Sequence, residues 1–159
     1  MDNRERVQLR ESCLIPYRHT DQGIEFCLIS PATGSRWEFP KTESDGQGGS
    51  AGELLNQAAA AAGLGGSLQD DGPLDTFVAA RGNEARHTTA YLMQVTHVDD
   101  DWPRQNTHRR LWCLAEEARV RLRRKPLRRF IDLALRSVDA ASGSPDRRTD
   151  PNALPNRPR

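Results

Sequence analysis

The sequence predicts an α/β protein, an α/β/α sandwich with a mixed sheet. Strand-like apolar runs lie on both sides of an alanine-rich helical segment that ends at Gly63-Leu64, and an amphipathic helical segment follows the last of them. Strands that are interrupted by one helix and closed by another fit a sheet covered by helices. At 159 residues the chain has the size of one domain with a single core.

Two apolar runs near the start predict a β-hairpin. Ser12 to Tyr17 and Ile24 to Ile29 are rich in strand-forming residues, and a polar turn from Arg18 to Gly23 separates them. We expect residues 1–11 to form an N-terminal arm and residues 12–140 to form the folded domain.

The alanine-rich helix carries its own start signal. Ser50-Ala51-Gly52-Glu53 has the spacing of a capping box, in which Ser50 accepts from a backbone N–H and Glu53 reaches back to the cap. After this helix, Gly65-Gly66 and the segment from Asp70 to Pro73 predict loops.

The second half predicts three more strands and two helices. The strands are expected at Leu74 to Ala80, His87 to Val98 and Arg109 to Leu114. A short helix is expected from Glu116. Pro126 suits the first turn of a last helix, whose apolar residues recur at helical spacing: Leu127, Phe130, Ile131, Ala134, Leu135 and Val138. Residues 141–159 are rich in Ser, Pro and Arg and are predicted to be a disordered tail.

Composition excludes several classes of protein. A formal net charge of +1 argues against a whole-chain electrostatic affinity for nucleic acid or membrane. No apolar run approaches the roughly 20 residues of a membrane span, and the start lacks a signal-peptide core, so we expect a cytoplasmic protein. Cys13, Cys27 and Cys113 lie in apolar segments without the paired spacing of a zinc site and are interpreted as buried free thiols.

A degenerate motif lies between Trp37 and Leu64. Trp37-Glu38-Phe39-Pro40-Lys41 and the alanine-rich helix together resemble the Nudix box, whose pattern is Gly, five residues, Glu, seven residues, then Arg-Glu-apolar-any-Glu-Glu-any-Gly-apolar. Only Gly63 and the apolar Ala58 and Leu64 match this pattern. The first glycine, the arginine and the four glutamates of the pattern are replaced. The residues at these positions are Thr42, Gly48, Asn56, Gln57, Ala60 and Ala61.

The replaced residues are those that a metal-dependent hydrolase needs. Hydrolysis of a pyrophosphate uses divalent cations, and Mg²⁺ prefers carboxylate oxygens, which a helix presents well at i, i+3 and i+4. That face here carries Gln57, Ala60 and Ala61. Of the acids nearby, Glu53 is interpreted first as a cap and Glu43 as a solvated loop acid. A catalytic or metal-binding role for either is the weaker interpretation, and the sequence predicts no metal site.

The resemblance to Nudix proteins covers residues 12–140. The second half is most similar to diphosphoinositol polyphosphate phosphohydrolases, through Arg86 to Thr96, Asp101-Trp102, Arg109 to Trp112 and Lys125-Pro126. The segment from Trp37 to Lys41 instead resembles diadenosine polyphosphate hydrolases. Both resemblances imply an α/β/α fold and a phosphate-rich small-molecule partner.

The resemblance also implies which residues would hold that ligand. Phosphates are bound mainly by Arg and Lys, and the candidates are Arg36, Lys41, Arg86, His87, His108, Arg109 and Arg110. Four of them, Arg36, Lys41, Arg86 and Arg109, are expected to converge beside the alanine-rich helix in an electropositive cleft with little acid.

Three functions remain open from the sequence. The first is a pseudoenzyme that binds a nucleoside or inositol polyphosphate without hydrolysing it and needs no cofactor. The second is an active hydrolase that uses Mg²⁺ held by relocated ligands such as Glu43, Asp45, Glu53, Glu116 or Glu117. The third is a protein or RNA interaction module that uses the basic run from Arg119 to Arg129 or the tail. A solvated helix surface is the favoured interpretation of the basic run, because no aromatic residues are interleaved in it.

Overall fold

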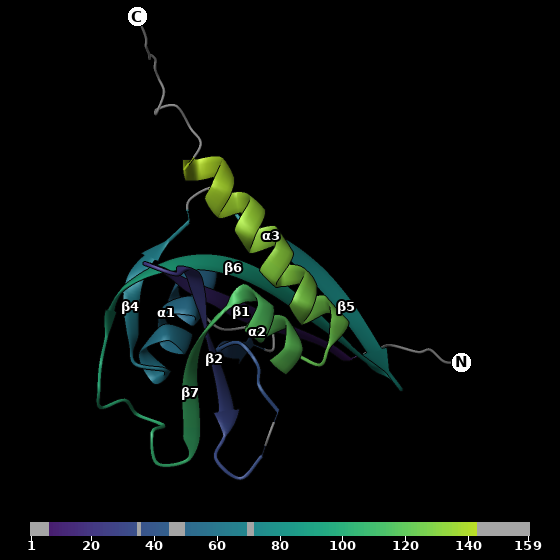
Figure 1. Ribbon diagram of the computed structural model, residues 1–159. Helices are drawn as coiled ribbons and strands as arrows, with labels where there is room; N and C mark the ends of the chain where they lie inside the picture. Colours follow the sequence, from purple (N-terminus) through teal and green to yellow (C-terminus); the bar gives the residue numbers. More distant parts are fainter. Residues whose placement is uncertain (1–6, 35, 45–49, 70–71, 143–159) are drawn as a thin grey trace, which may run out of the picture.

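The computed structural model describes residues 7–34, 36–44, 50–69 and 72–142. Within these ranges the chain forms one seven-stranded sheet with helices on both faces (Figure 1). The elements in chain order are β1 (Val7–Thr20), β2 (Gly23–Pro31), β3 (Lys41–Ser44), α1 (Ala51–Ala61), β4 (Leu64–Leu68), β5 (Asp75–Arg81), β6 (Glu84–Val98), β7 (His108–Leu114), α2 (Ala115–Arg121) and α3 (Lys125–Ser142).

The sheet is mixed, as the sequence predicts. Its main order is β4-β6-β1-β2-β7, and β3 and β5 pair with β1 and β6 respectively. The central pair is parallel, with residues 7–17 of β1 aligned with residues 84–94 of β6, whereas the other pairs are antiparallel. The predicted hairpin of the first two strands is confirmed by the antiparallel pairing of β1 with β2.

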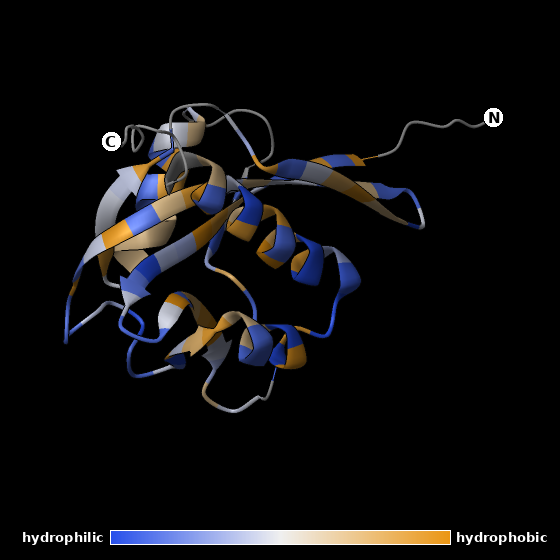
Figure 2. Ribbon diagram, turned by 45° about the horizontal axis from the view of Figure 1, so that its top comes forward, coloured by the Kyte–Doolittle hydropathy of each residue, from blue (hydrophilic) through white to orange (hydrophobic). Residues whose placement is uncertain are grey.

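Alternation along β1 separates two hydrophobic cores. Leu14 packs with Leu55 and Ala59 of α1, whereas Cys13 and Ile15 belong to the cluster that contains α2 and α3. The apolar stripe of α3 faces this second core, and apolar and polar stretches alternate along the helix in Figure 2. The α/β/α sandwich is therefore confirmed.

The structure corrects several boundaries. Gly65 and Gly66 lie in strand β4 and not in a loop, since Gly66 packs against the backbone of β6. A Cβ at Gly66 would lie 1.9 Å from the Gln94 carbonyl oxygen, so the glycine that suggested a loop instead permits a close approach of strands.

Strand β3, which the sequence did not predict, begins at Lys41. Residues 7–11, assigned to an arm, are part of β1. The predicted tail lies outside the described residues except for the end of α3, which extends to Ser142.

The three cysteines are free and buried, which confirms their interpretation. Burial raises the pKa of Cys27 to about 12 and that of Cys113 to about 11, and it also raises the pKa of Cys13. These thiols are therefore protonated at neutral pH and poor nucleophiles. Among the helices described, none is long and apolar enough to cross a membrane.

The capping box of α1 is also confirmed. The Glu53 backbone N–H donates to Ser50 Oγ at 3.2 Å, and the Ser50 backbone N–H donates to Glu53 Oε1 at 2.9 Å. The side chain of Glu53 therefore serves the helix start and is not held toward a cation.

Ser50→Ala is expected to lower the free energy of unfolding by about 1 kcal/mol, because one N-terminal N–H loses its partner. Glu53→Ala should lose a part of the same interaction. Urea unfolding of both variants measures this. An unchanged midpoint for Glu53→Ala would mean that its contact with the cap contributes no stability.

Candidate functional site

A buried carboxylate, Glu11, organises two cationic side chains on β1, β3 and β6. Lys41 Nζ lies 3.2 Å from Glu11 Oε2, and Arg86 Nη1 lies 3.0 Å from the same oxygen. The Thr88 hydroxyl donates to Glu11 Oε1 at 2.8 Å. Only 3% of Glu11 is exposed, so these three donors replace the water that its carboxylate would otherwise bind.

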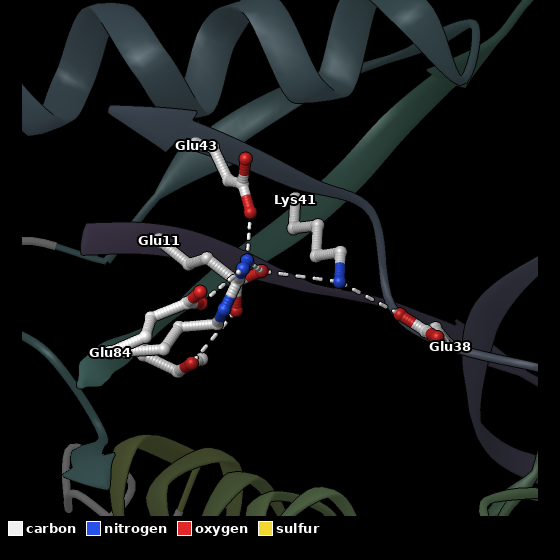
Figure 3. A network of polar contacts seen from close by, with 7 residues as sticks. Glu11, Glu38, Lys41, Glu43 and Glu84 are labelled. Atoms are coloured by element: carbon white, nitrogen blue, oxygen red, sulfur yellow. Dashed lines mark hydrogen bonds and ion pairs between the residues drawn. The ribbon is translucent and has the colours of Figure 1, made fainter. Parts of the chain in front are cut away.

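Three further glutamates complete this ion-pair network (Figure 3). Lys41 also pairs with Glu38 at 3.1 Å, while Arg86 pairs with Glu84 at 2.9 Å and with Glu43. The expectation of a cleft with little acid is therefore wrong, since two of the predicted phosphate ligands are already neutralised by carboxylates. Local sequence does not reveal this, because the β1–β6 register brings Glu11 and Arg86 together across 75 positions.

The ion-pair network shifts the pKa values of Glu11 and Lys41. Burial alone would raise the pKa of Glu11, but the Thr88 hydroxyl and the charges of Lys41 and Arg86 outweigh it and hold the pKa below its ordinary value. Burial likewise opposes the charge on Lys41, yet Glu38 and Glu11 raise its pKa. Both groups are therefore charged across the physiological range.

A cavity of about 700 Å³ opens beside this network, and we call it the arginine cavity. Six basic side chains and three carboxylates line it, together with Trp37, Ala79 and Ala80: Arg36, Lys41, Arg81, Arg86, Arg123 and Arg124, and Glu11, Glu38 and Glu84. The carboxylates are paired with Lys41 and Arg86. Within the described ranges, no carboxylate forms an ion pair with Arg36, Arg81, Arg123 or Arg124.

The arginine cavity lies on the sheet face that carries α2 and α3. Glu11 shares the face of β1 with Cys13 and Ile15, which pack in the α3 core, and Arg86 and Thr88 alternate onto the same face of β6. Helix α1 covers the opposite face. Arg36, Lys41 and Arg86 thus converge, as expected, but at a cavity that no residue of α1 lines.

The remaining predicted ligands are distributed elsewhere. His108, Arg109 and Arg110 line an open depression of about 600 Å³ around Trp37 and Trp102. The Arg109 guanidinium lies over Trp37 and donates to the Gly34 carbonyl at 2.6 Å. His108 also reaches a smaller cavity that contains Arg36 and Lys41. His87, which contacts Gln8 at 2.6 Å, is not among the lining residues of these cavities.

Arg110 has a structural role around Gly63. It donates to the Ala62 carbonyl at 2.6 Å and to the Asp99 carbonyl at 2.8 Å, and its guanidinium lies over the Trp102 ring. Gly63 has φ +73°, and a Cβ there would lie 2.6 Å from Trp102 Cβ. The positive φ and this crowding explain why position 63 requires glycine.

A further cavity, of about 230 Å³, lies between α1 and the β6–β7 loop, and we call it the box-helix pocket. Gln57, Ala58, Ala61 and Ala62 form its α1 wall. Lys41, Thr42 and Glu43 of β3 and Trp102 and Arg104 of the loop line the other sides, with Ile29 and Pro40. The Thr42 hydroxyl donates to the Leu54 carbonyl at 2.9 Å, so it ties β3 to the helix.

The suggested replacement metal ligands that lie within the described residues are not grouped. Glu43 pairs with Arg86, Glu53 caps α1, and Glu117 pairs with Arg121 at 2.8 Å. Glu116 lies exposed on α2. Among residues 7–34, 36–44, 50–69 and 72–142, no three His, Cys, Asp or Glu side chains are grouped as a metal site would need. Asp45 and Gly48 lie outside these ranges.

The basic run from Arg119 to Arg129 is divided by the fold. Arg119 pairs with Asp132 at 2.7 Å and Arg129 with Asp75 at 3.0 Å, while Arg128 donates to the carbonyls of residues 122 and 123. These contacts are those of an ordinary helix surface. Arg123 and Arg124 instead line the arginine cavity, a role that sequence spacing did not indicate.

Comparison with known proteins places the fold. No family model and no curated protein sequence matches the chain. An Ap4A hydrolase of C. elegans, in a binary complex, superposes with a TM-score of 0.65 at 16% identity over 84% of this chain and 98% of that one. A second structure of a C. elegans Ap4A hydrolase gives 0.55 at 18% identity over 84% and 98%. A candidate NUDIX hydrolase of Listeria monocytogenes gives 0.61 at 12% identity over 82% and 94%.

These matches define the class of fold. The chain has the Nudix fold, in agreement with the mixed sheet and the helices on its two faces. Because fold alone does not determine activity, the chemistry must be argued from the side chains.

Proposed function

We propose that this protein binds a phosphate-rich small molecule, a nucleoside or inositol polyphosphate, in the arginine cavity and does not hydrolyse it. The observation that carries the proposal is the formal surplus of three positive charges, from six basic and three acidic side chains, around one cavity. A volume of about 700 Å³ suits a small molecule. A protein with the same fold is named an Ap4A hydrolase, whose substrate belongs to this class.

The absence of hydrolysis follows from the face of α1 that lines the box-helix pocket. Gln57 and Ala61 supply an amide and a methyl group there, and neither neutralises Mg²⁺. Positive charge at the arginine cavity is supplied instead by Arg36, Arg81, Arg123 and Arg124, which form no ion pair with a carboxylate within the described ranges. A polyanion can therefore be attracted without a metal ion.

Calorimetry with inorganic tripolyphosphate, in EDTA, tests the binding. We expect binding that weakens with rising salt and falls about three- to tenfold in Arg36→Ser and in Arg81→Ser, because each loses a charge-assisted contact. Lys41→Ala should weaken it as well. Arg136→Ser removes the same charge from an exposed position on α3 that does not line the cavity, and it should bind as the wild type does. Strictly Mg²⁺-dependent binding, or equal losses in Arg136→Ser and Arg81→Ser, would contradict the proposal.

Incubation with Mg²⁺ should release neither nucleotides from a diadenosine polyphosphate nor phosphate from a diphosphoinositol polyphosphate above a buffer blank. Release that disappears in Glu53→Gln or Glu43→Gln would instead support a hydrolase with relocated ligands. The triple variant Gln57→Glu, Ala60→Glu, Ala61→Glu tests whether metal binding can be restored, with Mg²⁺ calorimetry as the readout.

A further inference from the structure

The box-helix pocket has a chemistry that phosphate binding does not use. Most of its wall is apolar, from Ile29, Pro40, Ala58, Ala61, Ala62 and the Trp102 ring. A hydrated cation would need several carboxylates, whereas Glu43 is the one carboxylate among the described lining residues and it is paired with Arg86.

The aromatic wall is held in place before any ligand arrives. Arg110 lies 4.9 Å from the Trp102 ring centroid and is itself fixed by the carbonyls of Ala62 and Asp99. The Trp102 backbone N–H donates to Gln105 Oε1 at 3.1 Å. A fixed aromatic side chain favours planar partners, because little conformational entropy is lost when they bind.

Polar groups suited to a heterocycle lie at the rim of the same pocket. The exposed Gln57 amide offers both a donor and an acceptor, and the exposed Arg104 guanidinium offers further donors. Base edges present the matching acceptors and donors. Hydroxyl-rich or phosphorylated rings would gain little from the apolar wall.

The box-helix pocket shares lining residues with the cavities that can hold phosphate. Lys41 lines the box-helix pocket, the arginine cavity and the smaller cavity that contains Arg36. A ligand that extends around strand β3 can therefore place a charged end at the arginines and an uncharged end against α1.

We propose that the box-helix pocket receives a heteroaromatic base, so that the ligand is a nucleoside polyphosphate and not an inositol polyphosphate. This inference rests on the proposed function, because it assigns the uncharged end of the same ligand.

Calorimetry in EDTA with ATP and inorganic tripolyphosphate, which share a triphosphate chain, tests the assignment. ATP should bind at least about tenfold more tightly, which is the scale of one base–aromatic contact. Ala61→Leu should abolish this difference by filling the pocket and leave the affinity for tripolyphosphate unchanged. Ala60→Leu is the matched control, since Ala60 is exposed on the same helix and does not line the pocket.

The outcomes separate the two proposals. Binding of neither compound by the wild type would overturn the proposed function together with this inference. Equal binding of ATP and tripolyphosphate, or tighter binding of inositol hexakisphosphate that is insensitive to Ala61→Leu, would overturn the base site alone. Equal effects of Ala60→Leu and Ala61→Leu would also overturn it. Circular dichroism of both leucine variants confirms that they are folded.

Discussion

Glu11→Gln is expected to lower the free energy of unfolding by about 2–3 kcal/mol. The substitution keeps the volume of the side chain but removes the charge that Lys41, Arg86 and Thr88 share. It also places an amide nitrogen, itself a donor, among donors. The cost stays below that of a fully buried pair because the side chains of Lys41 and Arg86 are 38% and 30% exposed.

Urea unfolding at pH 7 measures this effect, and Glu84→Gln is its control. Glu84 contacts the same guanidinium, but its side chain is 41% exposed, so its loss should cost less than about 1 kcal/mol. Similar losses in the two variants would show that burial of Glu11 is not what gives the network its stability.

The pH dependence of unfolding provides a second signature. Because the pKa of Glu11 is lowered by folding, its contribution is fully present above the ordinary value of 4.5 and is lost as the pH falls through the folded pKa. Because the pKa of Lys41 is raised, its contribution is present below the ordinary value of 10.5 and is lost as the pH rises through the folded pKa. Glu11→Gln should therefore show a weaker loss of stability in acid than the wild type.

Gly63→Ala should destabilise the protein by about 2–4 kcal/mol. One part of the cost is conformational, because φ is +73° at this position. The other part is steric, because the new Cβ would lie 2.6 Å from Trp102 Cβ and 2.7 Å from Arg110 Nη1. Relief of this clash requires movement of the loop that closes the box-helix pocket.

Gly82→Ala separates the conformational cost of a residue at positive φ from the steric cost of a clash. Gly82 has φ +61° in the turn between β5 and β6, and a Cβ there would meet no atom within 4 Å. Its thermal or urea unfolding should therefore report the conformational cost alone, about 1–2 kcal/mol. If Gly63→Ala costs no more than Gly82→Ala, the contact with Trp102 is not a constraint on this glycine.

Much of the fold follows from local patterns. Short apolar runs predict β1 and β2, and alternating apolar residues predict β6. Helical spacing predicts α3, and Ser50 with Glu53 predicts the start of α1. Such signals depend on neighbours a few positions apart. Strand β4 was not predicted, because Gly65-Gly66 is locally a turn signal. Only the pairing of β4 with β6 shows that glycine is needed there to let the two backbones lie close together.

The sequence also indicated some residues of the candidate site and missed others. The sequence indicated Arg36, Lys41 and Arg86, and these residues do converge. Glu11 was missed, although the alternation that places Cys13 and Ile15 in a core puts Glu11 on the same face and could have marked it as buried. Its partners could not be named, because the parallel register of β1 and β6 determines them.

The sequence by itself determined the class of fold and the uncharged helix face of Gln57, Ala60 and Ala61, because both depend on residue type at short, regular spacing. The tertiary structure alone decided where the charges meet. It joined Glu11 to Arg86 through strand pairing, and it brought Arg123 and Arg124 from the α2–α3 connection to the cavity that contains Arg36. Coulomb energies depend on distance and burial, and folding sets both between residues that are remote in the chain.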